Sequence, residues 1–162
     1  MAIQRLVLDT ITDDNYELIA IHCSLAPYKI AFALNKQIGL RLFRKKEDTI
    51  FKYDRFTVGF PLFQYYDYFQ YNMYNLLGNK CKIQIEPAPS TGLFSANTEA
   101  ITVTKYLVPE LKDVDYFLKI EAETYQFSSK LLTTQLLTIP QIVTAYLVDP
   151  TQLKSKNNLI LE

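Results

Sequence analysis

The stretch from Phe60 to Leu77, FPLFQYYDYFQYNMYNLL, constrains the fold more than any other part of the chain. It holds five tyrosines and three phenylalanines around a single charged residue, Asp67. Apolar and polar residues alternate along much of it, which is the two-residue period of a β-strand, and aromatic residues are favoured in strands. The pattern predicts an antiparallel hairpin that bends near Tyr66 and Asp67 and pairs Leu62 with Tyr71.

Some aromatic side chains have no predicted place in the core. Some of them are expected on the side of a strand that faces away from the core, and others crowd the bend of the hairpin. Together they form a candidate interaction surface of Phe63, Tyr65, Tyr66, Tyr68, Tyr74 and Phe117. A monomer seldom exposes a large apolar patch, aromatic residues are enriched at interfaces, and symmetric dimers are the commonest oligomers. We therefore expect a homodimer that uses this surface. The alternative cover is the proline-containing loop at 86–99, folded back over the sheet.

The remaining pattern predicts an α+β fold. Strands are expected at 16–23, 40–46, 56–62, 81–87, 101–108, 116–123 and 142–150, and helices at 26–39 and 127–139. Pro27 suits a first helical turn, Gly39 suits a C-terminal cap, and Pro140 ends the second helix. Each helix joins two strands, which gives two βαβ units. We expect a single domain over residues 1–162, with one mixed, mainly antiparallel sheet and two helices packed on one face, in a ferredoxin-like or related sandwich.

The strand at 116–123 has the clearest alternation in the chain. Leu118 is expected to face the core, whereas Phe117 and Lys119 are expected on the opposite, outward side of a half-buried strand.

Charge and composition limit the classes of partner. Seventeen basic residues balance seventeen acidic ones, so no overall field attracts nucleic acid or an anionic membrane. No apolar run reaches the roughly 18 to 20 residues of a membrane helix, and the N-terminus does not resemble a secretory leader. The two cysteines, Cys23 and Cys81, are not spaced as a metal site or a redox pair. We expect a cytoplasmic protein with no cofactor, no nucleic-acid partner and no membrane association.

Single features that can carry chemistry also have simpler structural interpretations. The basic run RLFRKK, from Arg41 to Lys46, is expected to be a solvated strand edge rather than an RNA-binding patch. His22 is the one histidine and is expected to be a core residue, and the four glycines form no phosphate-binding pattern. We therefore expect a non-enzymatic interaction or structural protein. The alternatives are a small-molecule regulatory module of ACT-like type, an enzyme, or a nucleic-acid binder.

The most distinctive motif is LVPELKDVDYFLKIE at 107–121. Glu110, Asp113 and Asp115 lie close together in this loop, and carboxylates can serve a hard cation or acid–base chemistry. The loop lacks the dense oxygen ligands and the glycine of a calcium loop. We expect instead a one-turn bend after Pro109, in which Glu110 or Asp113 accepts backbone hydrogen bonds and sets the register of the strand that begins at Tyr116.

This motif resembles the signature of the IPExxxVDY family of bacterial proteins. Val108 stands where the family name has isoleucine, and the matching residues are Pro109, Glu110, Val114, Asp115 and Tyr116. The similarity extends to LVLD near the start, ALNKQIG in the first helix, IPQIVTAYLVDP, and LKSKNNLIL near the end. The resemblance implies a bacterial protein that forms one domain, and it implies no catalytic residue, ligand or cofactor.

Overall fold

The computed structural model describes residues 15–53, 56–86, 99–123 and 127–161. In chain order the elements are β1 (Glu17–Cys23), α1 (Pro27–Ile38), β2 (Phe43–Arg44), β3 (Thr49–Lys52), β4 (Thr57–Phe60), β5 (Leu62–Asp67), β6 (Asn72–Gly78), β7 (Lys80–Ile85), β8 (Ile101–Tyr106), β9 (Tyr116–Ala122), α2 (Ser129–Leu137) and β10 (Ile142–Val148). Short 3-10 helices cover Pro109–Leu111, Pro150–Gln152 and Lys156–Leu159. The loop expected at 86–99 lies almost wholly outside the described residues.

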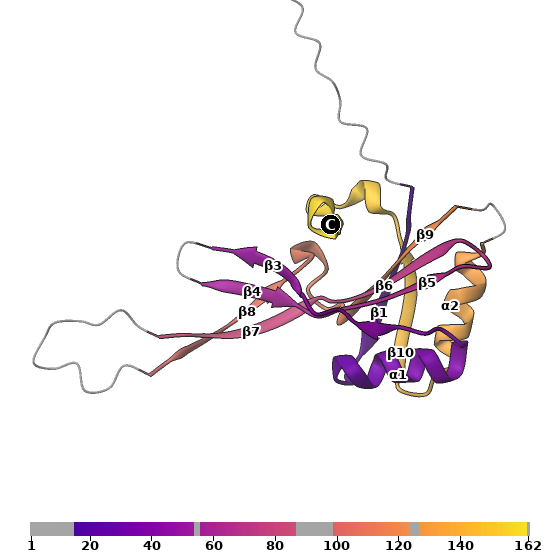
Figure 1. The fold of residues 1–162 in the computed structure, drawn as a ribbon. Coiled ribbons are helices and arrows are strands. Elements are labelled where there is room, and N and C mark those ends of the chain that lie inside the picture. The colour runs from indigo at the N-terminus through magenta and orange to yellow at the C-terminus, as the bar shows by residue number, and fades with distance from the viewer. Residues whose placement is uncertain (1–14, 54–55, 87–98, 124–126, 162) are drawn as a thin grey trace, which may run out of the picture.

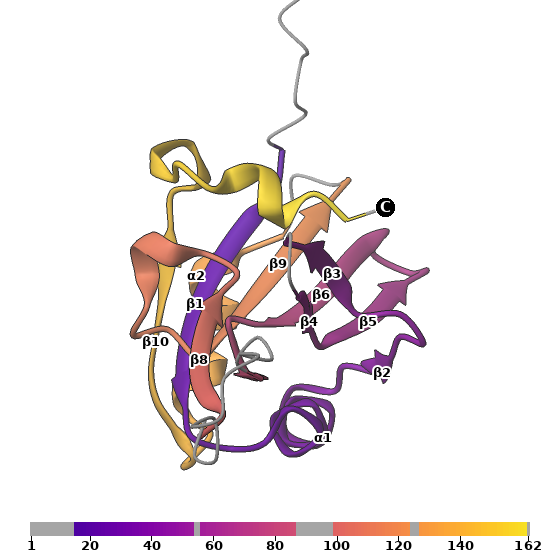
Figure 2. The same cartoon turned by 90° about the vertical axis from the view of Figure 1, so that its left-hand side faces the viewer.

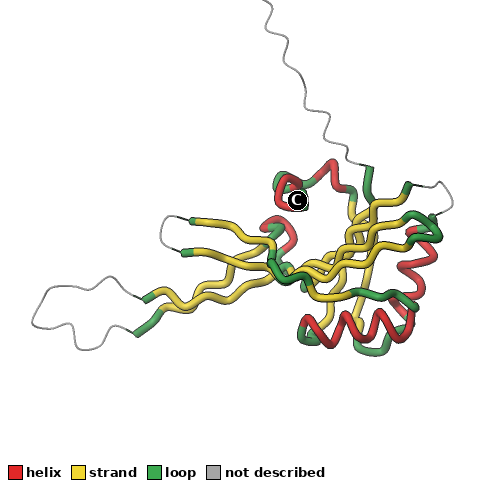
Figure 3. The backbone as a smooth tube through the Cα atoms, in the orientation of Figure 1, coloured by secondary structure: helices red, strands yellow, loops and turns green. Residues whose placement is uncertain are grey.

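The main sheet has six strands in the order β10-β1-β9-β6-β5-β2 (Figure 1). Every pairing found among the described strands is antiparallel, so the expected mixed sheet is antiparallel in this part of the chain. Two further two-stranded sheets, β3-β4 and β7-β8, extend away from the main sheet as an arm (Figure 3). The α+β prediction is confirmed, but the strands form three sheets rather than one.

The arm begins where two long strands change partners. β5 continues backwards through Pro61 into β4, and β6 continues through Asn79 into β7. The Gly78 amide donates to the Pro61 carbonyl at 3.1 Å, and a Cβ added at Gly78 would lie 2.9 Å from Cγ of Pro61. Glycine is therefore required here by the close approach of the proline ring. The Gly-Asn-Lys sequence that is typical of a turn instead bends a continuing strand.

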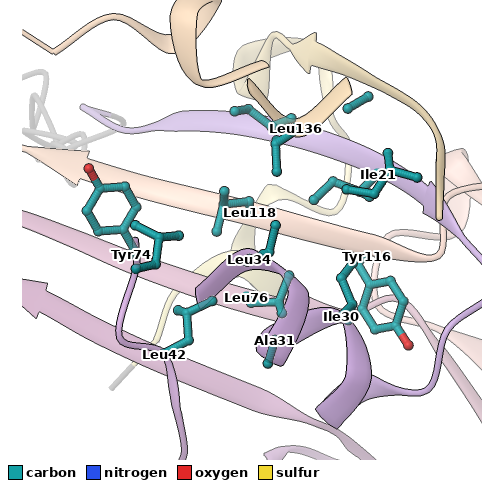
Figure 4. Packing of buried hydrophobic residues seen from close by; sticks show 14 of the residues in the cluster. Ile21, Ile30, Ala31, Leu34, Leu42, Tyr74, Leu76, Tyr116, Leu118 and Leu136 are labelled. Atoms are coloured by element: carbon teal, nitrogen blue, oxygen red, sulfur yellow. The ribbon is translucent and has the colours of Figure 1, made fainter. Parts of the chain in front are cut away.

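Both helices pack on the same face of the main sheet. Ile30 and Leu34 of α1 and Leu136 of α2 are fully buried against sheet residues such as Leu118. Figure 4 shows this cluster, with the rings of Tyr74 and Tyr116 at its two ends and their hydroxyls pointing away from it. The predicted caps are also present, because Gly39 ends α1 in the left-handed conformation at φ 82° and Pro140 follows α2.

The opposite face of the sheet is covered as well. Leu153 and Leu159 of the C-terminal segment pack on Leu18, Leu77 and Phe117. Figure 2 shows that the C-terminal segment crosses this second face. The expected half-buried strand is therefore buried on both faces over most of its length, since Phe117 and Lys119 are buried like their neighbours.

The hairpin register differs from the prediction. Leu62 pairs with Leu77 rather than with Tyr71, because the turn begins at Asp67 and includes the next residues up to Tyr71. The Asp67 carboxylate accepts hydrogen bonds from the amides of Phe69 at 2.9 Å and Gln70 at 3.3 Å. Such aspartate hydrogen bonds stabilise a turn that follows the aspartate.

Candidate functional site

The motif loop is organised by a residue outside the motif, Asn79. This asparagine is fully buried, and its side-chain amide donates to the carbonyl oxygens of Leu111 and Val114, each at 2.8 Å. Its Oδ1 atom accepts from the Val108 amide at 2.9 Å. The backbone of Asn79 also donates to Asp115 and accepts from Leu107. All its polar groups are satisfied by the loop, so Asn79 holds both ends of the motif against the arm.

The acidic residues of the motif join distant segments rather than gather into one site. Asp115 accepts from the Cys23 amide at 2.9 Å and from the Lys80 amine at 2.8 Å. Glu110 accepts from the amide and the hydroxyl of Ser155 at 2.8 and 2.6 Å. Although partial burial acts in the opposite direction, these hydrogen bonds lower the pKa of Glu110. The predicted acceptor role is confirmed for Glu110, but its donor lies in the C-terminal segment instead of its own loop.

The other motif residues complete this junction. Tyr116 donates its hydroxyl proton to the Leu25 carbonyl at 2.5 Å, and burial raises its pKa to about 12. Pro109 begins the 3-10 helix of the loop, and Asp113 is exposed. Within the described ranges, no group of three His, Cys, Asp or Glu side chains is placed to hold a metal ion. The motif geometry is that of a structural junction.

His22 does not lie in the core, so that prediction is wrong. Its ring is half-buried on the second face, with Nε2 3.4 Å from the Tyr146 hydroxyl and the ring centroids 5.7 Å apart. It pairs with Thr144 of the edge strand β10, and it lies beyond Ile21, where the pairing of β1 with β9 ends.

The aromatic surface expected from the sequence separates into two groups. Phe63, Tyr74 and Phe117 are buried within this chain, and Tyr65 stacks on Tyr74 with centroids 5.9 Å apart. The expectation that these rings need cover from a second copy is wrong, because the helices and the C-terminal segment already cover the two faces.

The second group is exposed at the β5–β6 turn. We call Tyr66, Tyr68, Phe69 and Tyr71 the aromatic turn. Tyr68 is 77% and Phe69 96% exposed, whereas Tyr66 is half-buried. Tyr71 has a φ of 55°, a left-handed conformation that costs energy for a bulky residue. The turn therefore holds the rings of Tyr68, Phe69 and Tyr71 at the surface.

A groove of about 1050 Å³ opens on the second face beside the aromatic turn. Tyr66, Met73 and Glu121 are directly paired across three strands and form one row of its floor. Tyr71, Glu123 and Lys156 also line it. The groove is at the upper limit of the size of ligand sites and combines aromatic rings with charged groups.

Lys119 is the buried charge of this groove. It is 5% exposed, its amine lies 2.6 Å from Glu121 Oε1, and it sits 4.6 Å from the centre of the Tyr16 ring. The directly paired Asn75 is also buried and accepts a hydrogen bond from Gln64 at 2.9 Å. Sequence alternation places Lys119 outward, but the folded chain covers that side, where Tyr16 lies over the amine and C-terminal residues line the same groove.

The two edges of the main sheet differ in their protection. β2 is two residues long and is followed by Lys45 and Lys46, which agrees with the expected solvated edge. β10 is seven residues long, has no charged residue, and pairs only with β1 among the described strands. Its Val143 side chain is 80% exposed. Long uncharged edges of this kind promote pairing with another chain.

No helix in the described part of the chain is long and apolar enough to cross a membrane. Comparison with known proteins finds no matching family model, no matching curated protein and no matching solved structure.

Proposed function

We propose that this chain is a non-enzymatic interaction protein that self-associates by joining two copies edge to edge through β10. The single observation that supports this most is the contrast between the two sheet edges. A short basic edge is a common device against association, whereas β10 is long and uncharged, and its one irregularity is a register shift against β1 at Val143. The dimer thus keeps the partner expected from the sequence but uses a different surface.

The β10 edge suits a second copy of itself. Antiparallel pairing centred on Ala145 would place Val143 of one copy opposite Leu147 of the other, and both side chains are exposed. No like charges would meet, because the strand is uncharged. The helix α2 packs against β10, so the two copies would also bring their α2 helices together. Leu131 and Leu137 are exposed on that helix and would add apolar contact.

Light scattering coupled to size-exclusion chromatography tests the dimer. We expect the wild-type mass to approach twice 18.8 kDa with rising concentration and Val143→Lys to stay at 18.8 kDa. Ile50→Lys is the matched control, since Ile50 is also an exposed strand residue but lies in the arm. A wild-type mass of 18.8 kDa at all concentrations, or equal effects of the two variants, would overturn the proposal.

A second candidate function is a small-molecule regulatory module of ACT-like type. It is favoured by the order of four strands, β10-β1-β9-β6, in which β1 lies between the two strands that flank α2. We propose that these strands are a ferredoxin-like core with β5 and β2 added at one side. Thermal unfolding in the presence of free amino acids tests this function, and an unchanged midpoint with every amino acid would count against it.

We also propose membership of the IPExxxVDY family. It rests on the five matching residues at Pro109, Glu110, Val114, Asp115 and Tyr116, and on the contacts that several of them make between separate segments.

A further inference from the structure

Two rings of the aromatic turn form a corner. The Tyr66 and Tyr68 ring centroids lie 4.7 Å apart with their planes at 80°. Tyr71 is the last residue of the turn, directly before β6, and lines the same groove as Tyr66. Tyr68 and Tyr71 are both exposed, so ring surface is left open to a ligand. Perpendicular aromatic rings with open faces are the walls of sites that bind organic cations.

Several other tyrosines of the described chain, unlike these rings, have a lysine over the ring. Lys29 lies over Tyr28 at 5.9 Å, and Lys105 lies over Tyr53 at 5.1 Å. Tyr106 and Tyr16 are likewise covered by Lys112 and Lys119. Among the described residues, no lysine or arginine lies over the rings of Tyr66, Tyr68 or Tyr71.

A carboxylate stands beside the corner. The Glu123 amide donates to the Tyr71 carbonyl at 3.4 Å, which fixes Glu123 next to the turn. Partial burial raises the pKa of Tyr66, and the charge of Glu123 raises it further. In the part of the chain described, the Glu123 side chain makes no hydrogen bond or ion pair, whereas Glu121 is paired with Lys119. The local charge available to a ligand is therefore negative.

We propose that Tyr66, Tyr68, Tyr71 and Glu123 form a binding site for a weakly hydrated organic cation, either a quaternary ammonium group or an arginine guanidinium. The rings attract the cation through their negative faces, and the carboxylate neutralises its charge. The adjoining groove gives room for the chain to which the cation is attached. The unpaired carboxylate disfavours a phosphate backbone, so nucleic acid does not fit this corner.

Proton NMR titrations test the site with two cations. Choline represents the quaternary ammonium class and N-acetylargininamide represents the arginine side chain, with 3,3-dimethylbutan-1-ol as the neutral analogue of choline. We expect saturable upfield shifts of ligand protons with at least one cation and weaker binding of the neutral analogue, because cation–π attraction is lost. The cation that binds more tightly shows whether the natural ligand carries a quaternary ammonium group or an arginine side chain.

Three variants locate the binding. Tyr68→Ala removes one wall of the site and is expected to weaken the binding of the preferred cation by about threefold to thirtyfold. Glu123→Gln should also weaken the binding of the cation but leave the binding of the neutral analogue unchanged. Tyr28→Ala is the control, because Tyr28 is also largely exposed but lies on α1. The site is overturned if neither cation gives a saturable shift at its solubility limit, if the neutral analogue binds as well as the cation, or if Tyr28→Ala weakens binding as much as Tyr68→Ala. Tyr68 is so exposed that its loss should not unfold the protein.

Discussion

The side-chain amide of Asn79 donates to the carbonyl oxygen of Val114 at 2.8 Å, across 35 positions of the chain. The same side chain binds Val108 and Leu111, so one buried residue closes the motif loop at both ends. The loop in turn reaches β1 through Asp115, the segment between β1 and α1 through Tyr116, and the C-terminal segment through Glu110. The junction therefore links the helix-covered face to the segment that covers the other face.

Replacing Asn79 with alanine should strongly destabilise the fold. The change leaves the Val108 amide and the carbonyls of Leu111 and Val114 without their partner in a buried place, at a cost of about 2 to 4 kcal/mol in the free energy of unfolding. Urea denaturation measures the loss. Asn157→Ala, at an exposed position, should change stability by less than about 0.5 kcal/mol. Equal effects of the two changes would contradict the central role of Asn79.

Gly78→Ala tests the close approach at the start of the arm. Its added Cβ would meet Cγ of Pro61 at 2.9 Å, and a proline ring cannot rotate away, so we expect a loss of about 1 to 3 kcal/mol. At Gly59 the added Cβ would meet the Asp48 carboxylate at 3.2 Å, and this flexible side chain can move. Gly59→Ala should therefore cost less. A double-mutant cycle with Pro61→Ala should show coupling, and strict additivity would refute the clash.

The sequence predicted those parts of the fold whose signal is local. The strand at 17–23 and both helices have regular apolar patterns and recognisable ends, and each is present with similar bounds. The hairpin register was wrong because the side chain of Asp67 and the left-handed Tyr71 determine where the turn begins and ends, and apolar spacing does not report on either.

The site was harder to predict because it depends on contacts between distant segments. Asn79 follows a glycine and precedes a lysine, a sequence typical of an exposed turn, yet the folded motif loop surrounds it. Lys119 stands at an outward position of an alternating strand, yet it is buried on a face that Tyr16 and the C-terminal segment also occupy. The aromatic composition did indicate the turn, but only the three-dimensional structure separates its exposed rings from the buried Phe63 and Tyr74.

Leu118→Asp should unfold the protein. Leu118 is fully buried between Ile19 of β1 and Leu76 of β6 on the helix-covered face. A carboxylate there has no partner, and its burial should remove most of the roughly 5 to 15 kcal/mol that stabilises a typical domain. Circular dichroism during heating is the measurement, and Leu118→Met, which keeps the volume, should lose less than about 1.5 kcal/mol. A cooperative transition of Leu118→Asp within a few degrees of wild type would contradict the assignment.

Glu110→Gln should lower stability modestly and in a pH-dependent way. The pKa of Glu110 is lowered in the folded state, so its contribution is present above the ordinary carboxyl pKa and is lost as the pH falls through the folded value. Because Glu110 is exposed, the loss near neutral pH should be about 1 kcal/mol or less. Urea unfolding at several pH values should show the difference from wild type shrinking in acid. Asp113→Asn, at an exposed site in the same loop, should show no such trend, and a pH-independent effect at Glu110 would contradict the hydrogen bonds to Ser155.

We expect the raised pKa of Tyr116 to make the protein less stable in alkali. Its pKa is raised from the ordinary tyrosine value of 10.0 to about 12, chiefly by burial, and the nearby Cys23 and Asp115 raise it further. A raised pKa means that the neutral phenol stabilises the fold fully below pH 10 and that this contribution is lost as the pH rises towards 12. The shift corresponds to about 2 to 3 kcal/mol.

The chain has eleven other tyrosines, so the measurement compares urea unfolding of wild type with that of Tyr116→Phe over this range. The phenylalanine variant lacks the hydrogen bond to Leu25 and should be less stable near neutral pH by about 1 kcal/mol, but the stability advantage of the wild type should disappear, or reverse, by pH 12. If the difference between the two proteins stays constant from neutral pH to pH 12, Tyr116 does not titrate with a raised pKa, and its hydroxyl is not held in the buried contact with Leu25.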